Sequence, residues 1–343
     1  MITNKEIEEI RKYLDKAENP LFFYDDDPDG LSSYLLLKTL NDKGKGLPIK
    51  SSPKLDELYI RKIKEYSPDY VFVLDKPIIT QEFVNKVNTK IIWIDHHPVV
   101  KINGVKYYNP RKENPNDNRP TSYWCYKIAN DKLWVAMCGI VGDWYVPEFL
   151  NEFIKLYPGL AKKSNDAAKL LFETKLGTLV KVFAFVLKGK VSDVKRNVAI
   201  LSKIKSPYEI LEQTTPKGKF IYRYYEKINK TFEKMLHEAK KHATKSKILV
   251  YTYPSSKHSL TGILSNQLLY TYPNKVIIIG RVKDDKVLMS IRSKKHNVLK
   301  ILETALKSVD GYGGGHDHAC GAGVNKEDFE TFVEEFKKVL NTN

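Results

Sequence analysis

The ten residues LFFYDDDPDG, at positions 21–30, place four carboxylates within five positions directly after an apolar run. The apolar run 21–24 is typical of a buried strand, and residues 31–40 are typical of a helix. Asp25, Asp27 and Asp29 would repel one another strongly at close range, so this turn needs a positive partner. A pair of divalent cations is the obvious candidate, because hard cations take oxygen ligands.

This stretch permits two interpretations other than a metal site. A solvated acidic turn is the plainer one, because Asp-Pro-Asp-Gly is a good turn sequence. A calcium loop of the D-x-D-x-D-G type would need a Glu at its twelfth position. Counted from Asp25, that position is Leu36, and the preceding segment looks like a strand rather than a helix. The calcium loop is therefore rejected.

The composition indicates a globular protein of about two domains. The chain has 343 residues, 42% of them hydrophobic and 11% aromatic, which is enough to build substantial cores. The 57 Lys and Arg against 41 Asp and Glu give a formal charge of +16. Such a charge favours polyanions such as nucleic acids. A lysine-rich proteome or a solubility device would explain the same charge.

The cysteines and the apolar segments bear on the cellular compartment. Cys125, Cys138 and Cys320 are scattered and lack metal-ligand spacing, as expected for buried thiols in a reducing cytosol. The first residues lack an apolar signal core, and no run approaches the ~18–20 apolar residues of a membrane span. We therefore expect a soluble, cytoplasmic protein without a membrane partner.

Two further apolar runs also end in acidic residues. The runs YVFVL and IIWI directly precede Asp75 and Asp95. With helices and a short strand near Ile49 in between, the alternation predicts a parallel sheet covered on both faces. Ligands of such sheets bind at the carboxyl ends of the strands. Asp25, Asp75 and Asp95 are therefore expected at one edge of the sheet.

Two histidines and one more Asp join these candidates. His96 and His97 follow Asp95 directly, and imidazole beside a carboxylate is a common metal ligand. Paired surface histidines are the alternative. Residues 132–145 predict a mostly apolar helix that carries Asp143 near its end. Buried Asp is rare unless it is paired or coordinated, and an exposed helix-end Asp is the alternative.

Together these blocks resemble the motifs of the DHH phosphoesterase family. They are D-x-D-x-D-G at 25–30, a lone Asp75, the Asp-His-His of 95–97 and a further Asp143, in the order of the family. By this resemblance the catalytic domain covers residues 1–190. The pyrophosphatase and nanoRNase branches usually place His where Asp25 stands, so the motif looks more like the RecJ-like exonuclease branch. Pro28 departs from the small residue usual there.

The resemblance implies roles for these residues. Two Mn²⁺ ions, with Mg²⁺ as the alternative, would be held by carboxylates and one imidazole, namely Asp25, Asp27, Asp29, Asp75, His96 and Asp143. Asp75 would bridge both ions in catalysis, and Asp95 would orient a neighbouring histidine. His97 would contact the scissile phosphate or assist the leaving group.

A helical connector at 191–245 and a smaller α/β domain at 246–343 follow. The glycine-rich stretch 311–323 is expected to be a loop that lets backbone N–H groups approach a phosphate, although glycine loops have many uses. It resembles the G-G-G-H motif of the DHH-associated C-terminal domain, which binds substrate in this family. The substrate contacts that the resemblance implies are Ser290, Arg292, Gly313, Gly314, Gly315 and His316. For Arg292, the alternative is an exposed salt bridge at the end of its strand.

Two segments permit two interpretations each. The apolar run 179–187 suits either the core or a surface for a protein partner. Residues 217–227 interleave aromatic and basic side chains, which suits single-stranded nucleic acid through stacking and phosphate attraction. An amphipathic helix with a buried apolar face is equally compatible with that second pattern.

The resulting expectation is an α/β protein whose parallel-sheet domain is joined by the connector to the smaller domain, with the active site in the cleft. We expect a two-metal phosphodiesterase, a RecJ-like exonuclease that hydrolyses single-stranded DNA or RNA to mononucleotides, as in DNA repair. A short-nucleotide phosphodiesterase, acting as a nanoRNase or on dinucleotides or cyclic dinucleotides, stays open. So does a non-catalytic replication or repair scaffold. A replication or repair protein partner and a homodimer are also left open.

Overall fold

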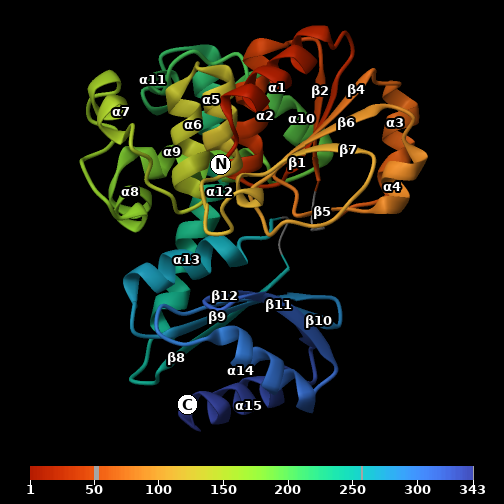
Figure 1. The fold of residues 1–343 in the computed structure, drawn as a ribbon. Coiled ribbons are helices and arrows are strands. Elements are labelled where there is room, and N and C mark those ends of the chain that lie inside the picture. The colour runs from red at the N-terminus through yellow and green to blue at the C-terminus, as the bar shows by residue number, and fades with distance from the viewer. Residues whose placement is uncertain (50–53, 256–257, 343) are drawn as a thin grey trace. The chain divides into compact units, whose positions relative to one another are not determined.

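The structure is a computed structural model that describes residues 1–49, 54–255 and 258–342. The chain divides into two compact units, Met1–Tyr225 and Glu226–Asn343 (Figure 1). The division falls within the long helix α12 (Pro216–Lys241), inside the segment expected to connect two domains. None of the described helices is both long and apolar enough to cross a membrane.

The first unit is built on a parallel sheet, as predicted, and this sheet has five strands. The last residues of neighbouring strands are paired, since Asp25 pairs with Ile49 and Leu74 pairs with Ile94. The residues that follow these strands therefore meet at one edge of the sheet. One strand, β7, was not predicted, because its four residues include a lysine and form no apolar run. In spatial order the strands are β2 (Lys45–Ile49), β1 (Leu21–Asp25), β4 (Tyr70–Leu74), β6 (Lys90–Ile94) and β7 (Val105–Tyr108).

Helices cover both faces of this sheet. On one face, α3 (Ile60–Tyr66) and α4 (Gln81–Lys86) pack over a core that contains Phe23 and Trp93. On the other, Phe22 contacts Tyr34 of α2, with ring centroids 5.4 Å apart. A fully buried side chain of this size contributes about 1.5–3 kcal/mol. The other helices up to residue 129 are α1 (Asn4–Lys16), α2 (Pro28–Leu40) and α5 (Thr121–Ala129). A separate two-stranded sheet pairs β3 (Lys54–Leu55) with β5 (Ile78–Ile79).

Further helices complete the first unit. The apolar run 179–187 lies in and directly after α9, and apart from half-buried Lys181 its side chains are buried. Of the two interpretations of this run, the structure supports the core. These helices are α6 (Leu133–Gly142), α7 (Leu150–Leu156), α8 (Ala167–Glu173), α9 (Lys175–Val186), α10 (Val191–Leu201) and α11 (Pro207–Leu211).

The interleaved aromatic and basic residues at 217–227 lie in α12. Tyr225 is only 7% exposed and stacks on Phe185, with ring centroids 5.8 Å apart. The hydroxyl of Tyr224 donates to the Lys188 carbonyl at 2.5 Å. These aromatic rings hold the helix against the first unit. The segment is thus an amphipathic helix with a buried apolar face, and Tyr224 and Tyr225 contact the first unit rather than forming an open stacking surface.

The second unit contains a mixed five-stranded sheet. Strand β8 (Ile248–Pro254) is parallel to β9 (Val276–Lys283), and the remaining neighbours are antiparallel. Helices α14 (Val298–Ala305) and α15 (Phe329–Thr342) pack on one face, and α13 (Thr261–Thr271) contacts β9 and β10. The sheet order is β11 (Gly311–His316), β12 (Ala319–Asn325), β10 (Lys286–Arg292), β9 and β8.

The expectation of a glycine loop at 311–323 was wrong. Residues 311–316 form the edge strand β11, which pairs with β12 in a regular antiparallel ladder. Glycine is depleted in strands because it has no side chain to pack, so the glycine-rich composition of residues 311–316 argues against a strand. Here the close packing requires it, since a Cβ on Gly313 would lie 2.9 Å from Leu302. The neighbouring helix and strand thus determine this conformation.

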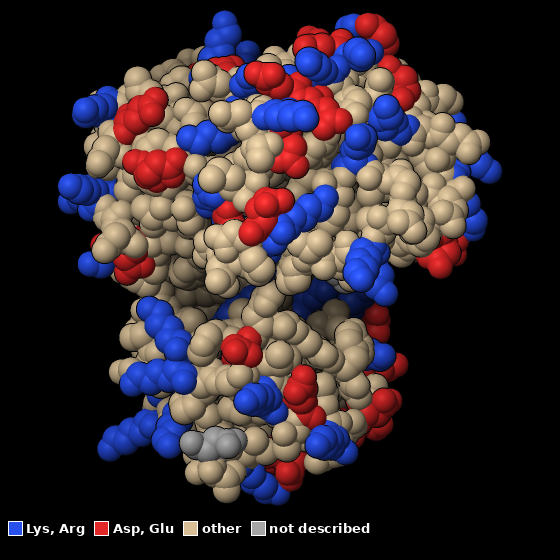
Figure 2. Space-filling view, viewed as in Figure 1, with Lys and Arg blue, Asp and Glu red and all other residues tan. Residues whose placement is uncertain are grey.

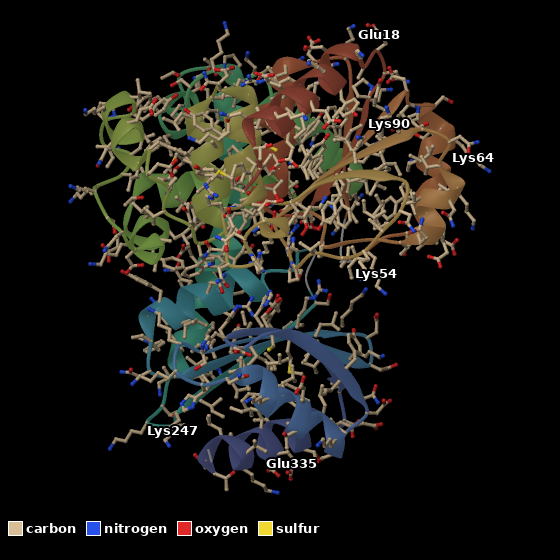
Figure 3. The ribbon with its side chains drawn as sticks, in the orientation of Figure 1. Glu18, Lys54, Lys64, Lys90, Lys247 and Glu335 are labelled. Carbon is tan, nitrogen blue, oxygen red and sulfur yellow. The ribbon has the colours of Figure 1, made fainter. Side chains whose placement is uncertain are left out.

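Charged side chains cover the visible surface without a single dominant patch. Figure 2 shows Lys and Arg distributed among Asp and Glu on this face of both units. Peripheral lysines such as Lys64 and Lys90 extend outward from the first unit (Figure 3). On this face, basic and acidic side chains are therefore interspersed rather than separated.

Candidate metal centre

The turn between β1 and α2 brings three carboxylates to the edge of the sheet. The helix begins at Pro28, earlier than expected, because Asp27 caps it by accepting the Gly30 N–H at 2.9 Å. A Cβ on Gly30 would lie 2.6 Å from both the backbone N and O of Asp25. Only glycine therefore lets the helix start so close to the end of the strand.

Asp29 is held by the start of another helix. Its side chain is 1% exposed and accepts the N–H groups of Thr121 and Ser122, each at 2.9 Å. The Ser122 hydroxyl also donates to it. These donors orient both carboxylate oxygens and join α5 to α2. No pattern in the sequence points to Thr121 or Ser122, because they lie more than ninety positions from Asp29 and match no motif.

Asp75 stands where β4 ends, and it is 2% exposed. Its backbone has φ 59°, a left-handed conformation that is uncommon for a residue other than glycine, Asn or Asp. Its N–H donates to the Ile94 carbonyl at 3.0 Å, and its Oδ1 accepts the Thr121 hydroxyl at 3.1 Å. The turn therefore holds this carboxylate beside the end of β6.

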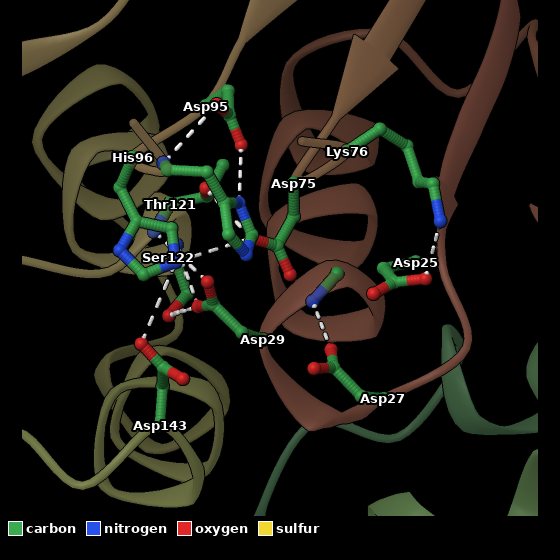
Figure 4. A network of polar contacts seen from close by, with 12 residues as sticks. Asp25, Asp27, Asp29, Asp75, Lys76, Asp95, His96, Thr121, Ser122 and Asp143 are labelled. Atoms are coloured by element: carbon green, nitrogen blue, oxygen red, sulfur yellow. Dashed lines mark hydrogen bonds and ion pairs between the residues drawn. The ribbon is translucent and has the colours of Figure 1, made fainter. Parts of the chain in front are cut away.

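His96 connects Asp75 with Asp143. Its Nε2 lies 3.5 Å from Asp75 Oδ1 and 3.6 Å from Asp143 Oδ2 (Figure 4). Asp143 follows the C-terminus of α6 directly, and its side chain is 35% exposed. The helix thus delivers a carboxylate from a distant part of the chain to the strand ends.

His97 is paired with the carboxylate of Asp95. His97 Nδ1 lies 2.7 Å from Asp95 Oδ1, and Asp95 is fully buried. The other Asp95 oxygen accepts hydrogen bonds from Tyr107 Oη at 3.3 Å and from Asn109 Nδ2 at 3.2 Å. Tyr107 lies in strand β7 and Asn109 directly follows it. Neither residue was predicted, because this strand was not predicted.

A buried lysine also enters this centre and was not predicted. Lys76 is 0% exposed, and its Nζ donates to Asp25 Oδ1 at 2.8 Å (Figure 4). Its carbonyl accepts the indole N–H of Trp93 at 2.9 Å. The only signal in the sequence was a lysine directly after a strand-end carboxylate.

The predicted ligands thus lie together. Within each of three sets, ligand atoms lie within 4.8 Å of one another. We call Asp25, Asp27 and Asp75 the Asp25 group, and Asp29, His96 and Asp143 the Asp143 group. The third set is Asp75, His96 and His97, so Asp75 and His96 each occur twice. The three sets therefore overlap, and Asp75 lies 3.5 Å from the His96 of the Asp143 group.

The pKa values of these groups follow from burial and mutual repulsion. Burial, with the charges of Asp25 and Asp29, raises the pKa of Asp27 to about 7. Burial and the neighbouring carboxylates also raise the pKa values of Asp75 and Asp143 well above the ordinary range. These carboxylates are costly to ionise without a nearby cation. Several oxygens and one nitrogen at short range suit Mn²⁺ or Mg²⁺, so the residues present fit a pair of such ions.

The pKa values of the two histidines are shifted in opposite directions. Burial, with the charge of His97, lowers the pKa of His96 to about 4, so His96 is neutral, the form that binds metal. Burial alone would lower the pKa of His97, but the hydrogen bond and charge of Asp95 raise it above its ordinary value. His97 is therefore the more readily protonated imidazole.

In the second unit, four of the six predicted substrate-binding residues share one sheet face. Arg292 pairs with Ala319, which pairs with His316, and Ser290 is linked to Gly314 through Gly321 in the same way. Directly opposed residues in antiparallel strands point to the same face. Gly313 and Gly315 alternate with these residues along β11 and so belong to the opposite face.

Arg292 is held in place by its neighbours. Its Nε donates to Asn266 Oδ1 at 3.0 Å, and its Nη1 donates to the Ile291 and Cys320 carbonyls at 2.9 and 3.0 Å. Among the described residues, Arg292 forms no salt bridge, and its Nη2 forms no hydrogen bond. The N–H groups of Nη2 are therefore left for an anion. A Cβ on Gly314 would meet nothing within 4 Å, so the face above it is open.

Comparison with known proteins supports the expected family resemblance. Residues 245–342 match the DHHA1 domain family, and no curated protein matches the chain. The fold is similar to RecJ from Thermus thermophilus in complex with Mn²⁺, with TM-score 0.70, 13% identity, and coverage of 100% of this chain and 56% of that chain. The chain thus spans little more than half of that RecJ. The Mg²⁺ complex of the same protein is also similar, with TM-score 0.63, 13% identity, and coverage of 100% and 53%.

Two shorter proteins are also similar in fold. An exonuclease RecJ bound to manganese has TM-score 0.61 and 14% identity over 99% of this chain and 94% of that one. PggH, a pGpG-specific phosphodiesterase from Vibrio, has TM-score 0.52 and 12% identity over 94% and 99%. The predicted fold class is confirmed, and the fold is that of RecJ and related DHH proteins.

Proposed function

We propose that this chain, which has the RecJ fold and a DHHA1 domain at 245–342, is a metal-dependent phosphodiesterase of the RecJ-like exonuclease type. The observation that carries the proposal is the convergence of the Asp25 group and the Asp143 group around Asp75. Four distant parts of the chain supply these side chains. A solvated acidic turn would not require the burial of Asp29, Asp75 and Asp95 together.

The cofactor that fits this centre is a pair of Mn²⁺ ions, with Mg²⁺ as the alternative. When bound, such a pair would activate a water molecule and stabilise the attacking and leaving oxygens of an in-line displacement at phosphorus. The Asp25 group and the Asp143 group would hold the ions, with Asp75 beside both. Thr121 and Ser122 keep Asp75 and Asp29 oriented through the hydrogen bonds described above.

His97 is the residue suited to the scissile phosphate. Its bond to Asp95 fixes the ring and favours the protonated form, and its side chain is 28% exposed. A protonated imidazole can donate a hydrogen bond to a phosphate oxygen or a proton to the leaving oxygen. Asp95 does not need to contact substrate for this, because it acts through His97.

We propose single-stranded DNA or RNA as the substrate, degraded from one end to mononucleotides. Asp25 at the start of the acidic motif and the net charge of +16 both favour this choice. In the second unit, Arg292, Ser290 and His316 would bind the phosphate or sugar of the terminal nucleotide. The open face over Gly314 would let the nucleotide backbone approach the strand closely.

A short-nucleotide phosphodiesterase is the second candidate. The observation in its favour is the likeness to the pGpG-specific PggH, since 94% of this chain and 99% of that one are covered. The expected products separate the two candidates, because only an exonuclease shortens a long strand progressively.

Product analysis with Mn²⁺ tests the proposal. The protein is given an end-labelled single-stranded 20-mer and, separately, a dinucleotide. Progressive release of mononucleotides from the 20-mer supports the exonuclease, and labelling either end gives its polarity. Cleavage of the dinucleotide alone supports the second candidate. No cleavage of either substrate contradicts the proposed activity and favours a non-catalytic scaffold.

Asp75→Ala is the variant that tests the assigned centre. Because Asp75 lies beside both metal positions, its loss should abolish Mn²⁺-dependent turnover while circular dichroism shows a folded protein. Lys64→Ala, at an exposed surface position, is the matched control and should retain full activity. Undiminished turnover by Asp75→Ala would refute the assignment.

A further inference from the structure

The residue directly after Asp143 has a strained backbone. Trp144 has φ 61°, in the left-handed region that bulky residues rarely adopt. Of the described residues other than glycine that have a positive φ, Trp144 is the only aromatic one, and the others are polar. This conformation costs free energy, because the Cβ crowds the following carbonyl oxygen. The chain therefore carries a tryptophan here at a cost to its own stability.

The end of helix α6 requires this conformation. The N–H of Tyr145 donates to the Ile140 carbonyl at 3.1 Å. The N–H of Trp144 donates to the Val141 carbonyl at 3.0 Å. These two bonds are those of a Schellman motif, in which the left-handed residue is usually glycine. The motif holds Asp143 at the end of the helix, but it gives no reason for a tryptophan at the next position.

The side chain of Trp144 is only partly covered. Its ring contacts Phe172 of α8, with ring centroids 5.9 Å apart and ring planes at 61°. Packing on Phe172 is the plain explanation for a large apolar residue here, but it leaves 43% of Trp144 exposed. The other tryptophans of the chain are at most 3% exposed, namely Trp93, Trp124 and Trp134. Trp144 is therefore the tryptophan that presents open aromatic surface.

This surface belongs to a residue beside the candidate metal centre. The Cα atom of Trp144 is about 3.8 Å from that of Asp143, as for any two consecutive residues. The Asp143 carboxylate lies 3.6 Å from His96 Nε2, and its side chain is itself 35% exposed. The centre is thus open to solvent at the residue that precedes Trp144. The indole is within reach of a nucleotide bound there.

We propose that Trp144 is a nucleobase-binding residue, whose indole stacks on a base of the single-stranded substrate beside the metal centre. Every base has a flat π-face, so stacking on an aromatic side chain adds affinity without selecting a sequence. Strained backbone conformations cluster at sites that bind ligands. This contact would explain why a tryptophan stands where glycine would avoid the strain. The inference rests on the proposed function for the identity of the substrate.

Two strands of equal length and charge test this inference. The full chain with Mn²⁺ is mixed rapidly with a single-stranded oligothymidylate 20-mer or with an abasic 20-mer, and intrinsic tryptophan fluorescence is followed before turnover. We expect the thymidylate strand to quench the exposed indole and the abasic strand to leave it unquenched. The phosphates are the same in both strands, so the difference reports on the bases.

Trp144→Gly removes the indole but supplies the residue that the end of α6 favours. Glycine adopts this φ without strain, so the position of Asp143 and the affinity for Mn²⁺ should be unchanged. Affinity for the thymidylate strand should fall about five- to hundredfold, whereas affinity for the abasic strand should stay the same.

Two further variants serve as controls. Trp144→Tyr keeps an aromatic face and should keep most of the affinity for the thymidylate strand. Leu58→Ala removes another apolar side chain of the first unit, one that is 81% exposed. It should leave the binding of both strands unchanged, which separates stacking on Trp144 from a general loss of exposed apolar surface.

The outcomes distinguish this inference from the proposed function. Unchanged affinity of Trp144→Gly for the thymidylate strand, or an equal loss for both strands, would overturn the stacking role and leave packing on Phe172 as the role of the indole. A loss confined to the thymidylate strand, without hydrolysis of any substrate by the unsubstituted protein, would overturn only the proposed function. Hydrolysis by a protein whose binding does not depend on Trp144 would overturn only this inference. Binding of neither strand would overturn both.

Discussion

Gly30→Ala tests whether the start of α2 positions the metal ligands. An added Cβ would lie 2.6 Å from the backbone N and O of Asp25 and 2.9 Å from its Cα. Contacts between such atoms are normally at least about 3.4 Å, so the strand end and the helix must separate by a large part of an ångström. Both partners are backbone, and no side-chain rotation relieves the clash.

The magnitude follows from this displacement. Overpacking a well-packed site costs about 1–3 kcal/mol, which we expect as the loss in free energy of unfolding. A misplacement approaching 1 Å can lower turnover about a hundredfold, because Asp25 and Asp27 lie on either side of the widened contact. Chemical denaturation without metal measures the first effect, and Mn²⁺-dependent hydrolysis with calorimetric Mn²⁺ affinity measures the second.

Gly262→Ala is the matched control for this experiment. Gly262 lies in helix α13, and a Cβ there would meet nothing within 4 Å. Alanine in a helix is favoured over glycine by up to about 1 kcal/mol, so this variant should be as stable as the parent or more stable. Normal stability and normal Mn²⁺ affinity of Gly30→Ala would refute the idea that the close approach at Asp25 shapes the centre.

Other predictions concern protons and the residues that support the ligands. Because the pKa of Asp27 is raised to about 7, Mn²⁺ must displace a proton below that pH, and its affinity should fall about tenfold per unit as pH decreases from 7, measured by calorimetry at several pH values. Constant affinity from pH 5 to 7 would contradict the raised pKa. Ser122→Ala removes the hydroxyl that donates to buried Asp29 while the backbone N–H remains, and it should lower the free energy of unfolding by about 1–3 kcal/mol in denaturant titrations. An unchanged value would show that the hydroxyl is dispensable. Asp95→Asn should lower the pKa of His97, followed by the pH dependence of its ring proton resonances, and should reduce turnover without removing Mn²⁺ binding. An unshifted His97 titration would show that Asp95 does not control this imidazole.

The local pattern of the sequence was enough to predict most of the first sheet and the acidic residues that follow its strands. Apolar runs that end in Asp25, Asp75 and Asp95 identify strands by their length and composition. Parallel pairing then brings the ends of those strands to one edge, whatever the details of packing. The fold class and the identity of the acidic residues at this edge were therefore accessible before the structure.

Tertiary structure alone decided how those residues are supported. Lys76 pairs with a carboxylate 51 positions away, and the Ser122 donors reach Asp29 across 93 positions. The strand that supplies Tyr107, and the glycine strand of the second unit, form because of the neighbours with which they pair. Such contacts leave no periodic or compositional trace, because hydrogen bonds and charge pairs between distant segments depend on the completed fold. Local sequence thus determined which chemistry the edge of the sheet carries, and packing determined its charge balance and geometry.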